Sequence, residues 1–171
     1  ISRTKDTGVL SREDAIKLGT TGSVLRASGV DFDIRKKEPY DVYEEMDFQT
    51  NVLKEGDSYA RSKIPWLDMF ESCRIIRDAL KKMPKSGSVR VKLKPKPKGG
   101  DTEVYRRVES GRGSLGMHIV SRGMPQPYRL KISVPSFRNL IAMPHLLTGE
   151  KLGNMPAVYW SLNYWPVEAD R

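Results

Sequence analysis

The longest regular pattern of apolar positions lies in the middle of the chain. Between about Asp57 and Met83, apolar side chains recur every three or four residues, which places them on one face of a helix. These positions are Leu67, Phe70, Cys73, Ile76, Leu80 and Met83. Pro65 predicts a kink or the first turn of this helix, and Pro84 ends it. Because Cys73 belongs to the apolar face, we expect a buried and unreactive thiol.

Three later segments have the pattern of β-strands. They span Glu103–Glu109, Leu115–Ser121 and Tyr128–Val134, and the last alternates apolar with polar side chains. Glycine and proline at 111–113 and 123–127 are typical of turns. The sequence therefore predicts a small antiparallel sheet.

Short helices are predicted on either side of these elements. Ser11 is a candidate cap for a helix that stops at Gly19. Ser136 is a candidate cap for another, and a further short helix holds Leu146 and ends near Gly149. The apolar face of the helix after Ser136 is formed by Phe137, Leu140, Ile141 and Met143.

Glycine is dense between Gly19 and Gly29, with Gly22 between them. This density indicates positive φ angles or a backbone packed closely against another element. Phosphate binding is a weaker interpretation, because neither the P-loop nor the dinucleotide-binding spacing is present.

Together these elements predict an α+β fold, mostly helical, in which the small antiparallel sheet forms a flap. With 171 residues, the chain is long enough for one domain, 1–171, and short for two. We interpret the segment at about 85–101, rich in proline, lysine and glycine, as a flexible excursion from that domain.

Composition excludes several classes of protein. No run approaches the roughly 18–20 apolar residues of a membrane span, and no secretory signal is present. The single cysteine, Cys73, excludes an internal disulfide and a cysteine-rich metal site within this chain, and two histidines disfavour any other metal site built by this chain alone. A self-contained soluble enzyme is disfavoured, because no nucleophile–base pair or carboxylate pair has a recognisable motif. The start at Ile1 suggests a processed product, a split subunit or a part of a longer chain.

The net charge of +9 implies acidic partners, and its densest basic run is Lys92–Lys98. A basic nucleic-acid-associated structural protein is therefore an alternative. The run lacks the aromatic residues on which bases stack, so a solvated loop or an electrostatic contact with a partner subunit is the better interpretation.

The last eleven residues, Ser161–Arg171, resemble the C-terminal tail of nickel–iron hydrogenase large subunits. In that tail two cysteines bind the metal, and here Trp165 and Glu168 stand in their places. An indole cannot replace the thiolate that nickel requires, so the resemblance implies a kept fold without the metal chemistry. Glu168, Asp170 and Arg171 also fit the corresponding tail of complex I large subunits.

The resemblance extends over most of the chain. Five further segments resemble, in the same order, the catalytic large subunit shared by complex I, membrane-bound hydrogenases and related archaeal ferredoxin-dependent sulfur-reducing complexes. They are 21–43, 56–76, 109–113, 127–131 and 135–140. The resemblance implies a nickel–iron hydrogenase large-subunit-like fold, of which this sequence covers the C-terminal part.

The resemblance also implies a function as one subunit of a membrane-associated respiratory oxidoreductase, inactive alone. Electrons from NADH or ferredoxin would pass from an iron–sulfur cluster in a neighbouring small subunit to a quinone or sulfur-type acceptor, coupled to ion pumping. The expected partners are that small subunit, the N-terminal part of the large subunit and membrane-arm subunits, without nucleic acid. The chain itself would bind no cofactor and no metal. It would lie at the cytoplasmic face of the membrane, in a peripheral arm, and meet the membrane only through the complex.

The same resemblance nominates Arg112, Glu168 and Trp165 as catalytic residues. Arg112 matches an arginine that lies over the metal in hydrogenases and could steady a reduced acceptor, or it could pair with a local carboxylate. The turn before it departs from the family, with Ser110-Gly111 in place of Ala-Pro. Glu168 could carry protons, or form a salt bridge with Arg171 or another cation. Trp165 would fill the volume of the absent metal.

Overall fold

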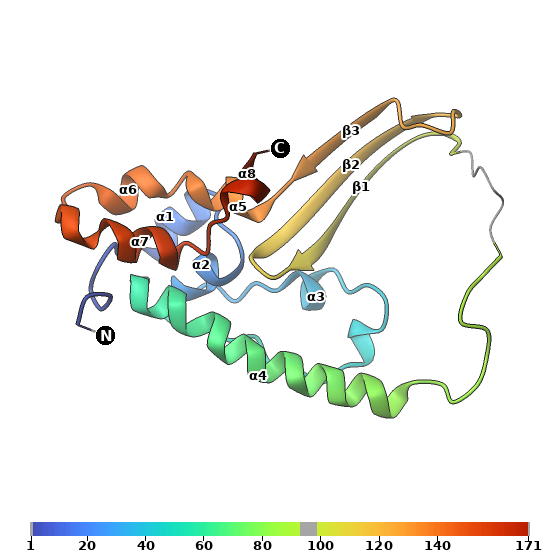
Figure 1. Ribbon diagram of the computed structural model, residues 1–171, viewed down its shortest axis with the longest axis horizontal. Coiled ribbons are helices and arrows are strands. Elements are labelled where there is room, and N and C mark those ends of the chain that lie inside the picture. The colour runs from blue at the N-terminus through green and yellow to red at the C-terminus, as the bar shows by residue number, and fades with distance from the viewer. Residues whose placement is uncertain (1, 93–98, 171) are drawn as a thin grey trace.

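The computed structural model describes residues 2–92 and 99–170 and has the predicted α+β character (Figure 1). Helices predominate, and one three-stranded antiparallel sheet, in the order β1-β2-β3, projects from them. The elements are α1 (Arg12–Lys17), α2 (Gly22–Ala27), α3 (Ile34–Lys37), η1 (Tyr43–Glu45), α4 (Ser58–Lys82), β1 (Asp101–Ser110), β2 (Gly113–Arg122), β3 (Arg129–Ser133), α5 (Pro135–Leu140), α6 (Met143–Leu147), η2 (Leu152–Asn154), α7 (Met155–Ser161) and α8 (Pro166–Ala169).

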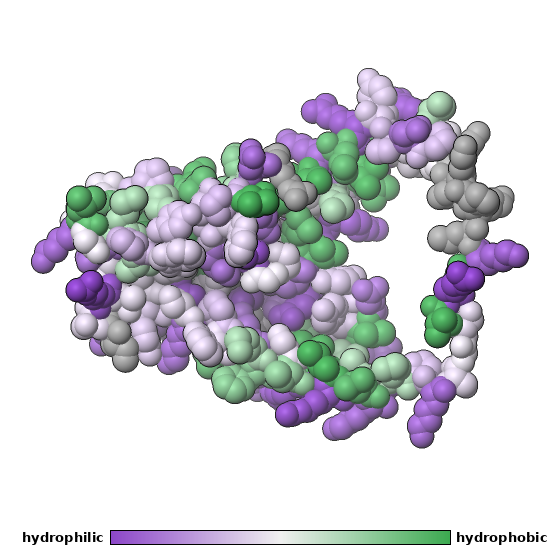
Figure 2. Space-filling model, viewed as in Figure 1, coloured by the Kyte–Doolittle hydropathy of each residue, from purple (hydrophilic) through white to green (hydrophobic). Residues whose placement is uncertain are grey.

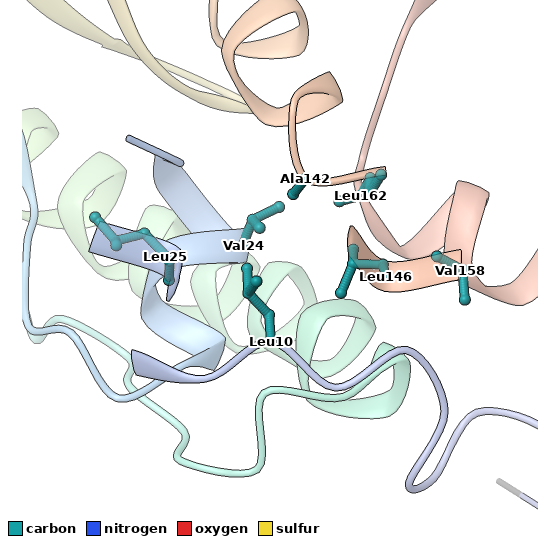
Figure 3. Packing of buried hydrophobic residues seen from close by; sticks show 8 residues of the cluster. Leu10, Val24, Leu25, Ala142, Leu146, Val158 and Leu162 are labelled. Atoms are coloured by element: carbon teal, nitrogen blue, oxygen red, sulfur yellow. The ribbon is translucent and has the colours of Figure 1, made fainter. Parts of the chain in front are cut away.

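The main hydrophobic core lies where the short helices meet. Leu10 and Val24 pack there with Leu146, Val158 and Leu162, all almost fully buried (Figure 3). These residues come from both ends of the chain, so the core joins the N-terminal segment and α2 to α6 and α7. The β1–β2 turn lies beside this helical end of the molecule, where β2 contacts α2 and α5.

The sheet follows the predicted strands, each extended by a few residues at its ends or shortened by one. Val104 pairs with Ile119, and Ile119 pairs with Leu130. These three side chains share one face of the sheet and are 40–49% exposed. The sheet is therefore a flap with an apolar face that the described chain covers only in part.

Helix α4 confirms the predicted bounds but corrects the predicted burial. The side chain of Asp57 caps it by accepting a hydrogen bond from the backbone N–H of Ala60. Pro65 lies within the continuous helix. The fully buried residues lie in the first two turns, where α4 contacts α2 and α7.

Beyond those turns, the predicted apolar face of α4 is exposed. Phe70, Ile76 and Leu80 expose 57–68% of their surface, and Figure 2 shows hydrophobic side chains among hydrophilic ones along the outer half of α4. The expectation that Cys73 is buried is wrong, because its thiol is free and exposed. The physical reason is that α4 continues past α2 and α7, and its later contacts, such as those of Glu71 and Lys82, are made by polar side chains.

Buried Arg61 connects the start of α4 to α7. Its guanidinium donates to the Ser161 hydroxyl (3.0 Å), the Gly56 carbonyl (2.7 Å) and the Ser58 hydroxyl (3.0 Å). Burial lowers the pKa of Arg61 to about 10, although the charge of Asp57 opposes this change. These bonds position the segment that leads into the C-terminal tail.

The short helices α1 and α6 confirm their predictions, whereas α5 requires a correction. Ser136 does not cap α5: Val134 precedes the helix, Pro135 occupies its first position, and Ser136 lies within the first turn. The apolar face predicted there is also largely exposed, since Phe137 and Ile141 are 63% and 57% accessible. Helices α2, α3, α7 and α8 were not predicted.

Residues 93–98 of the lysine-rich run lie outside the described part of the chain. Among the described helices, none has the length and apolar character needed to cross a membrane.

Candidate functional site

The three candidate residues Arg112, Trp165 and Glu168 line the same cavity, of about 440 Å3. The Cζ atom of Arg112 lies 4.9 Å from the centroid of the Trp165 ring. The other walls are apolar: Leu115, Met117, Ile132, Val134 and Val167. The structure therefore brings together a turn and a tail that lie far apart in sequence. We call this cavity the tail pocket.

Arg112 is positioned by the tight turn between β1 and β2. Ser110 pairs with Gly113, which leaves Gly111 and Arg112 as the two loop residues. Gly22 packs directly against this turn with a φ of +63°, and a Cβ atom there would lie 2.4 Å from the carbonyl oxygen of Arg112. The predicted close approach of the glycine segment is thus confirmed, and its partner is the turn that carries Arg112.

Two buried hydrogen bonds hold the same contact. The backbone N–H of Ser114 donates to the Thr21 hydroxyl (3.0 Å), and the backbone N–H of Thr21 donates to the side-chain oxygen of Asn139 (2.8 Å). Thr21 therefore connects β2 to α5. Leu115 and Met117 of β2 line the tail pocket, and Ser136 of α5 contacts Glu168 of its lining. The contact through Thr21 therefore positions two elements that shape the pocket.

The guanidinium of Arg112 has no carboxylate partner among the described residues, and its Nε atom is buried without a hydrogen bond there. The local ion pair expected as an alternative is therefore not found in that part of the chain. Stacking on Trp165 orients the cation instead. Its donors are left available for an anionic group.

Glu168 contacts Ser136 of α5. The hydroxyl of Ser136 donates to Glu168 Oε2 and accepts a hydrogen bond from the backbone N–H of Trp165 (3.2 Å). One buried hydroxyl therefore fixes both tail residues. The expected partner Arg171 lies outside the described residues.

Trp165 is 52% exposed, so it stands at the mouth of the pocket and does not fill a sealed volume. In residues 2–92 and 99–170, no three His, Cys, Asp or Glu side chains are grouped so that they could hold a metal ion.

A second set of polar residues lies on the other side of the turn and was not singled out from the sequence. Four of them line a cavity of about 430 Å3: Arg26, Arg35, Asp68 and Glu109. Asp33 lies behind the cavity wall and forms ion pairs with Arg26 and Arg35. We call these five residues the charge cluster. Ser110, Gly111 and Gly113 line the same cavity. The turn thus separates this cavity from the tail pocket. The available signal for these residues was the family resemblance, since the segments that carry it include Arg26, Asp33, Arg35 and Glu109.

In the charge cluster, the pKa of Asp33 is lowered and the pKa of Glu109 is raised. Although burial opposes it, hydrogen bonds and charge from Arg35 hold the pKa of Asp33 below its ordinary value. Burial raises the pKa of Glu109 to about 7; the charges of Asp33 and Asp68 add to this effect, and those of Arg26 and Arg35 oppose it. Glu109 is therefore the member of the cluster that changes its charge near neutral pH.

Comparison with known proteins places these features in context. The sequence matches the family model described as respiratory-chain NADH dehydrogenase, 49 Kd subunit, over residues 1–99 and 92–171. It is 40% identical over 199 residues to an NADH-quinone oxidoreductase subunit of Chloroherpeton thalassium, covering 100% of this chain and 44% of the relative. It is also 40% identical over 172 residues to the corresponding NADH-quinone oxidoreductase subunit of Dehalococcoides mccartyi, covering 99% of this chain and 46% of the relative.

A solved structure shows the same fold. One chain of the membrane-bound sulfane sulfur reductase, an archaeal respiratory membrane complex, matches with a TM-score of 0.91 and 36% identity. The match covers 99% of this chain and 47% of that one. This chain therefore spans a little under half the length of the relatives with which it was compared.

Proposed function

This chain belongs to the family of the 49 Kd subunit of respiratory-chain NADH dehydrogenase, and we propose that it forms a wall of the catalytic pocket in a membrane-associated respiratory oxidoreductase complex. Electrons pass there from an iron–sulfur cluster in a neighbouring small subunit to a quinone or sulfur-type acceptor, coupled to ion pumping. The names of the relatives support both acceptor classes, since some are NADH-quinone oxidoreductase subunits and another belongs to a sulfane sulfur reductase.

The observation that carries the proposal is an available cation at an apolar pocket. Arg112 stacks on Trp165 and has no carboxylate partner in the described chain. An acceptor gains negative charge when it is reduced, and a guanidinium can stabilise that charge through charge-assisted hydrogen bonds. The apolar walls, among them Leu115 and Ile132, suit a quinone ring or polarisable sulfur and strengthen the interaction by excluding water.

The residues in the tail fit a pocket that works without its own metal. An indole and a carboxylate stand where the hydrogenase relatives of the family carry thiolates, and Glu168 is held by Ser136. We propose that the chain binds no cofactor and that the cluster belongs to the small subunit. NADH and ferredoxin are both candidate electron donors.

The remaining partners follow from the same family. We propose contacts with the N-terminal part of the large subunit and with membrane-arm subunits, at the cytoplasmic face of the membrane. Large exposed apolar side chains on α4, such as Phe70 and Ile76, are the kind of surface that subunits cover. The comparisons give no support to the alternative of a nucleic-acid-associated protein.

The test is acceptor reduction by the assembled complex, purified from native membranes with the cluster reduced by dithionite. A short-chain quinone and polysulfide are offered separately, which distinguishes the two acceptor classes. We expect Arg112→Gln to lower turnover at least tenfold, about 1.4 kcal/mol in barrier height, with cluster reduction unchanged.

The matched control is Arg122→Gln, because Arg122 lies on the same sheet, is 57% exposed and is far from the turn. It should stay within about twofold of wild type. Equal turnover in both variants would remove Arg112 from the mechanism, and no reduction of either acceptor by wild type would reject the proposed function itself.

A further inference from the structure

The charge cluster holds more acids than bases in a nearly buried space. Arg26 and Arg35 provide two positive charges, whereas Asp33, Asp68 and Glu109 can provide three negative charges. The side chains of Arg26 and Asp33 are 3% and 1% exposed, so water screens these charges poorly. The cluster becomes neutral when one acid carries a proton.

Hydrogen-bond partners identify which acid that is. Arg35 donates to both oxygens of Asp33, at 3.0 and 2.7 Å. Arg26 and Asn51 each donate to one oxygen of Asp68. Among the described residues, the carboxylate of Glu109 is within ion-pair distance of the Arg26 guanidinium alone, at 4.0 Å, and accepts no hydrogen bond. The surplus negative charge therefore falls on Glu109.

Every element packed around Glu109 contributes a charged or titratable group. These groups are Arg26 of α2, Asp33 before α3, Arg35 of α3, Tyr40 of the following loop, Tyr43 of η1 and Asp68 of α4. The hydroxyl of Tyr40 accepts a hydrogen bond from the backbone N–H of Glu109 and does not bond to its carboxylate. Burial, together with the charges of Asp33 and Asp68, raises the pKa of Glu109 to about 7 against the opposing charges of Arg26 and Arg35.

The cavity can deliver protons to this carboxyl group. Its lining contains polar side chains beside Pro65 and Met69, and the buried Ser23 hydroxyl and Arg26 Nε have no hydrogen-bond partner among the described residues, as expected where ordered water binds. The carboxylate of Asp68 is 29% exposed, which connects the cavity to solvent. Protons can therefore reach Glu109 without passing through the tail pocket.

Glu109 and the tail pocket are close along the chain. Only Ser110 and Gly111 separate Glu109 from Arg112, so the Cα atoms of Glu109 and Arg112 lie within about 10 Å of each other. The rigid contact between Gly22 and the turn fixes this relationship. A charge that appears in the tail pocket consequently acts on Glu109 over a short distance.

We propose that Glu109 is a redox-linked proton-binding site, which takes up one proton from solvent when the complex is reduced and negative charge arrives at the tail pocket. The step forms one O–H bond on the carboxylate and consumes one solvent proton, which is released again on reoxidation. This inference rests on the proposed function for the location of the added charge. At roughly 10–12 Å and an effective dielectric constant of about 20, one unit charge raises a pKa by about one unit.

The test is infrared titration of the assembled complex, following the C=O stretch of protonated carboxyl groups. In the oxidised complex, a band that is absent from Glu109→Gln should titrate near pH 7. After reduction by dithionite, the midpoint of the same band should rise by about one pH unit. Glu44→Gln, which removes an exposed carboxyl group, should keep the band and its shift.

A second variant keeps the test decisive if Glu109→Gln fails to assemble. Asp68→Asn removes a negative charge that disfavours ionised Glu109, so the midpoint should fall below that of wild type. An unchanged midpoint in Asp68→Asn, or the same midpoint in oxidised and reduced wild type, would overturn the inference. Dithionite reduces the complex whichever acceptor it uses, so loss of quinone and polysulfide turnover reports separately on the proposed function.

Discussion

The guanidinium of Arg112 lies over the indole ring of Trp165, with 4.9 Å between Cζ and the ring centroid. This contact joins the β1–β2 turn to the C-terminal tail, at a position where related hydrogenase tails carry a thiolate. The substitution does more than remove a ligand, because the aromatic ring supplies a surface that orients the cation. The tail pocket thereby has a defined place for positive charge.

Removal of this ring should affect function more than stability. Trp165 is half exposed, so Trp165→Ala should cost about 1 kcal/mol from lost stacking and packing, below the roughly 3–5 kcal/mol of a buried aromatic residue. Acceptor reduction should fall at least fivefold because Arg112 loses its orientation. Thermal denaturation and turnover of the assembled complex measure the two effects. Trp160→Ala, at a tryptophan that is 74% exposed, is the control, and wild-type turnover in Trp165→Ala would end the pocket assignment.

The close contact at Gly22 predicts a large effect from one methyl group. In Gly22→Ala, the new Cβ would meet the carbonyl oxygen of Arg112 at 2.4 Å, so the turn must move. We expect a loss of about 2–4 kcal/mol in stability together with reduced turnover. Gly149→Ala is the matched control, because Gly149 also has a positive φ, of +82°, but has no atom within 4 Å of its Cβ position. Its loss should be limited to about 1 kcal/mol of backbone strain, and an equal loss in both would refute the contact argument.

Substitutions at Ser136 and Glu168 distinguish two possible roles of the Glu168 carboxylate, proton transfer and structural pairing. Ser136→Ala removes a buried hydroxyl that bonds both Glu168 and the Trp165 backbone, so it should cost about 1–3 kcal/mol in stability. Glu168→Gln can still accept the Ser136 hydrogen bond. If Glu168 carries protons, this variant loses turnover at unchanged thermal stability; if the residue is a salt-bridge partner, stability falls first. Thermal denaturation and turnover, measured on the same preparation, distinguish the two.

The exposed face of α4 should make the chain depend on partners. Phe70 and Ile76 are 68% and 57% exposed, and an isolated chain that presents such a surface should aggregate or bind a hydrophobic dye. The double variant Phe70→Ser and Ile76→Ser should improve solubility and impair assembly of the complex. Leu152→Ser, at an equally apolar but separate exposed site, should change neither the solubility of the chain nor the assembly of the complex. A monomeric wild-type chain that unfolds cooperatively on its own would contradict this expectation.

The elements that the sequence predicted well are those specified by local signals. The bounds of α4 follow from Asp57 as its cap and from residue spacing, and the strands follow from alternation and from glycine in the turns. Burial was predicted less well, because it depends on which elements lie opposite. Cys73 has the spacing of a core residue but lies beyond the part of α4 that packs against α2 and α7, and it is exposed.

The candidate site divides in the same way. Arg112, Trp165 and Glu168 were nominated by resemblance, and the structure brings them to one pocket, which no spacing rule could show. Ser136 was misassigned as a cap because Pro135, the residue before it, already begins the helix. Glu109 was missed as a titratable group, because its pKa depends on burial and on the charges of Arg26, Asp33 and Asp68, which are distant from it in sequence.

That environment leads to a pH dependence of stability with a defined sign. The pKa of Glu109 rises from an ordinary value of 4.5 to about 7 in the folded chain, so the folded state binds the proton more tightly than the unfolded state. Stability is therefore lost as the pH rises from about 4.5 to about 7 and then levels off. In Glu109→Gln this loss is absent, and the stability of the variant relative to wild type should increase over the same window by roughly 2–3 kcal/mol.

Thermal denaturation midpoints of the complex between pH 5 and 8 measure the change. The exposed Glu44→Gln control should follow the wild-type curve, and a Glu109→Gln curve parallel to wild type throughout would show that this carboxyl group does not titrate in that range.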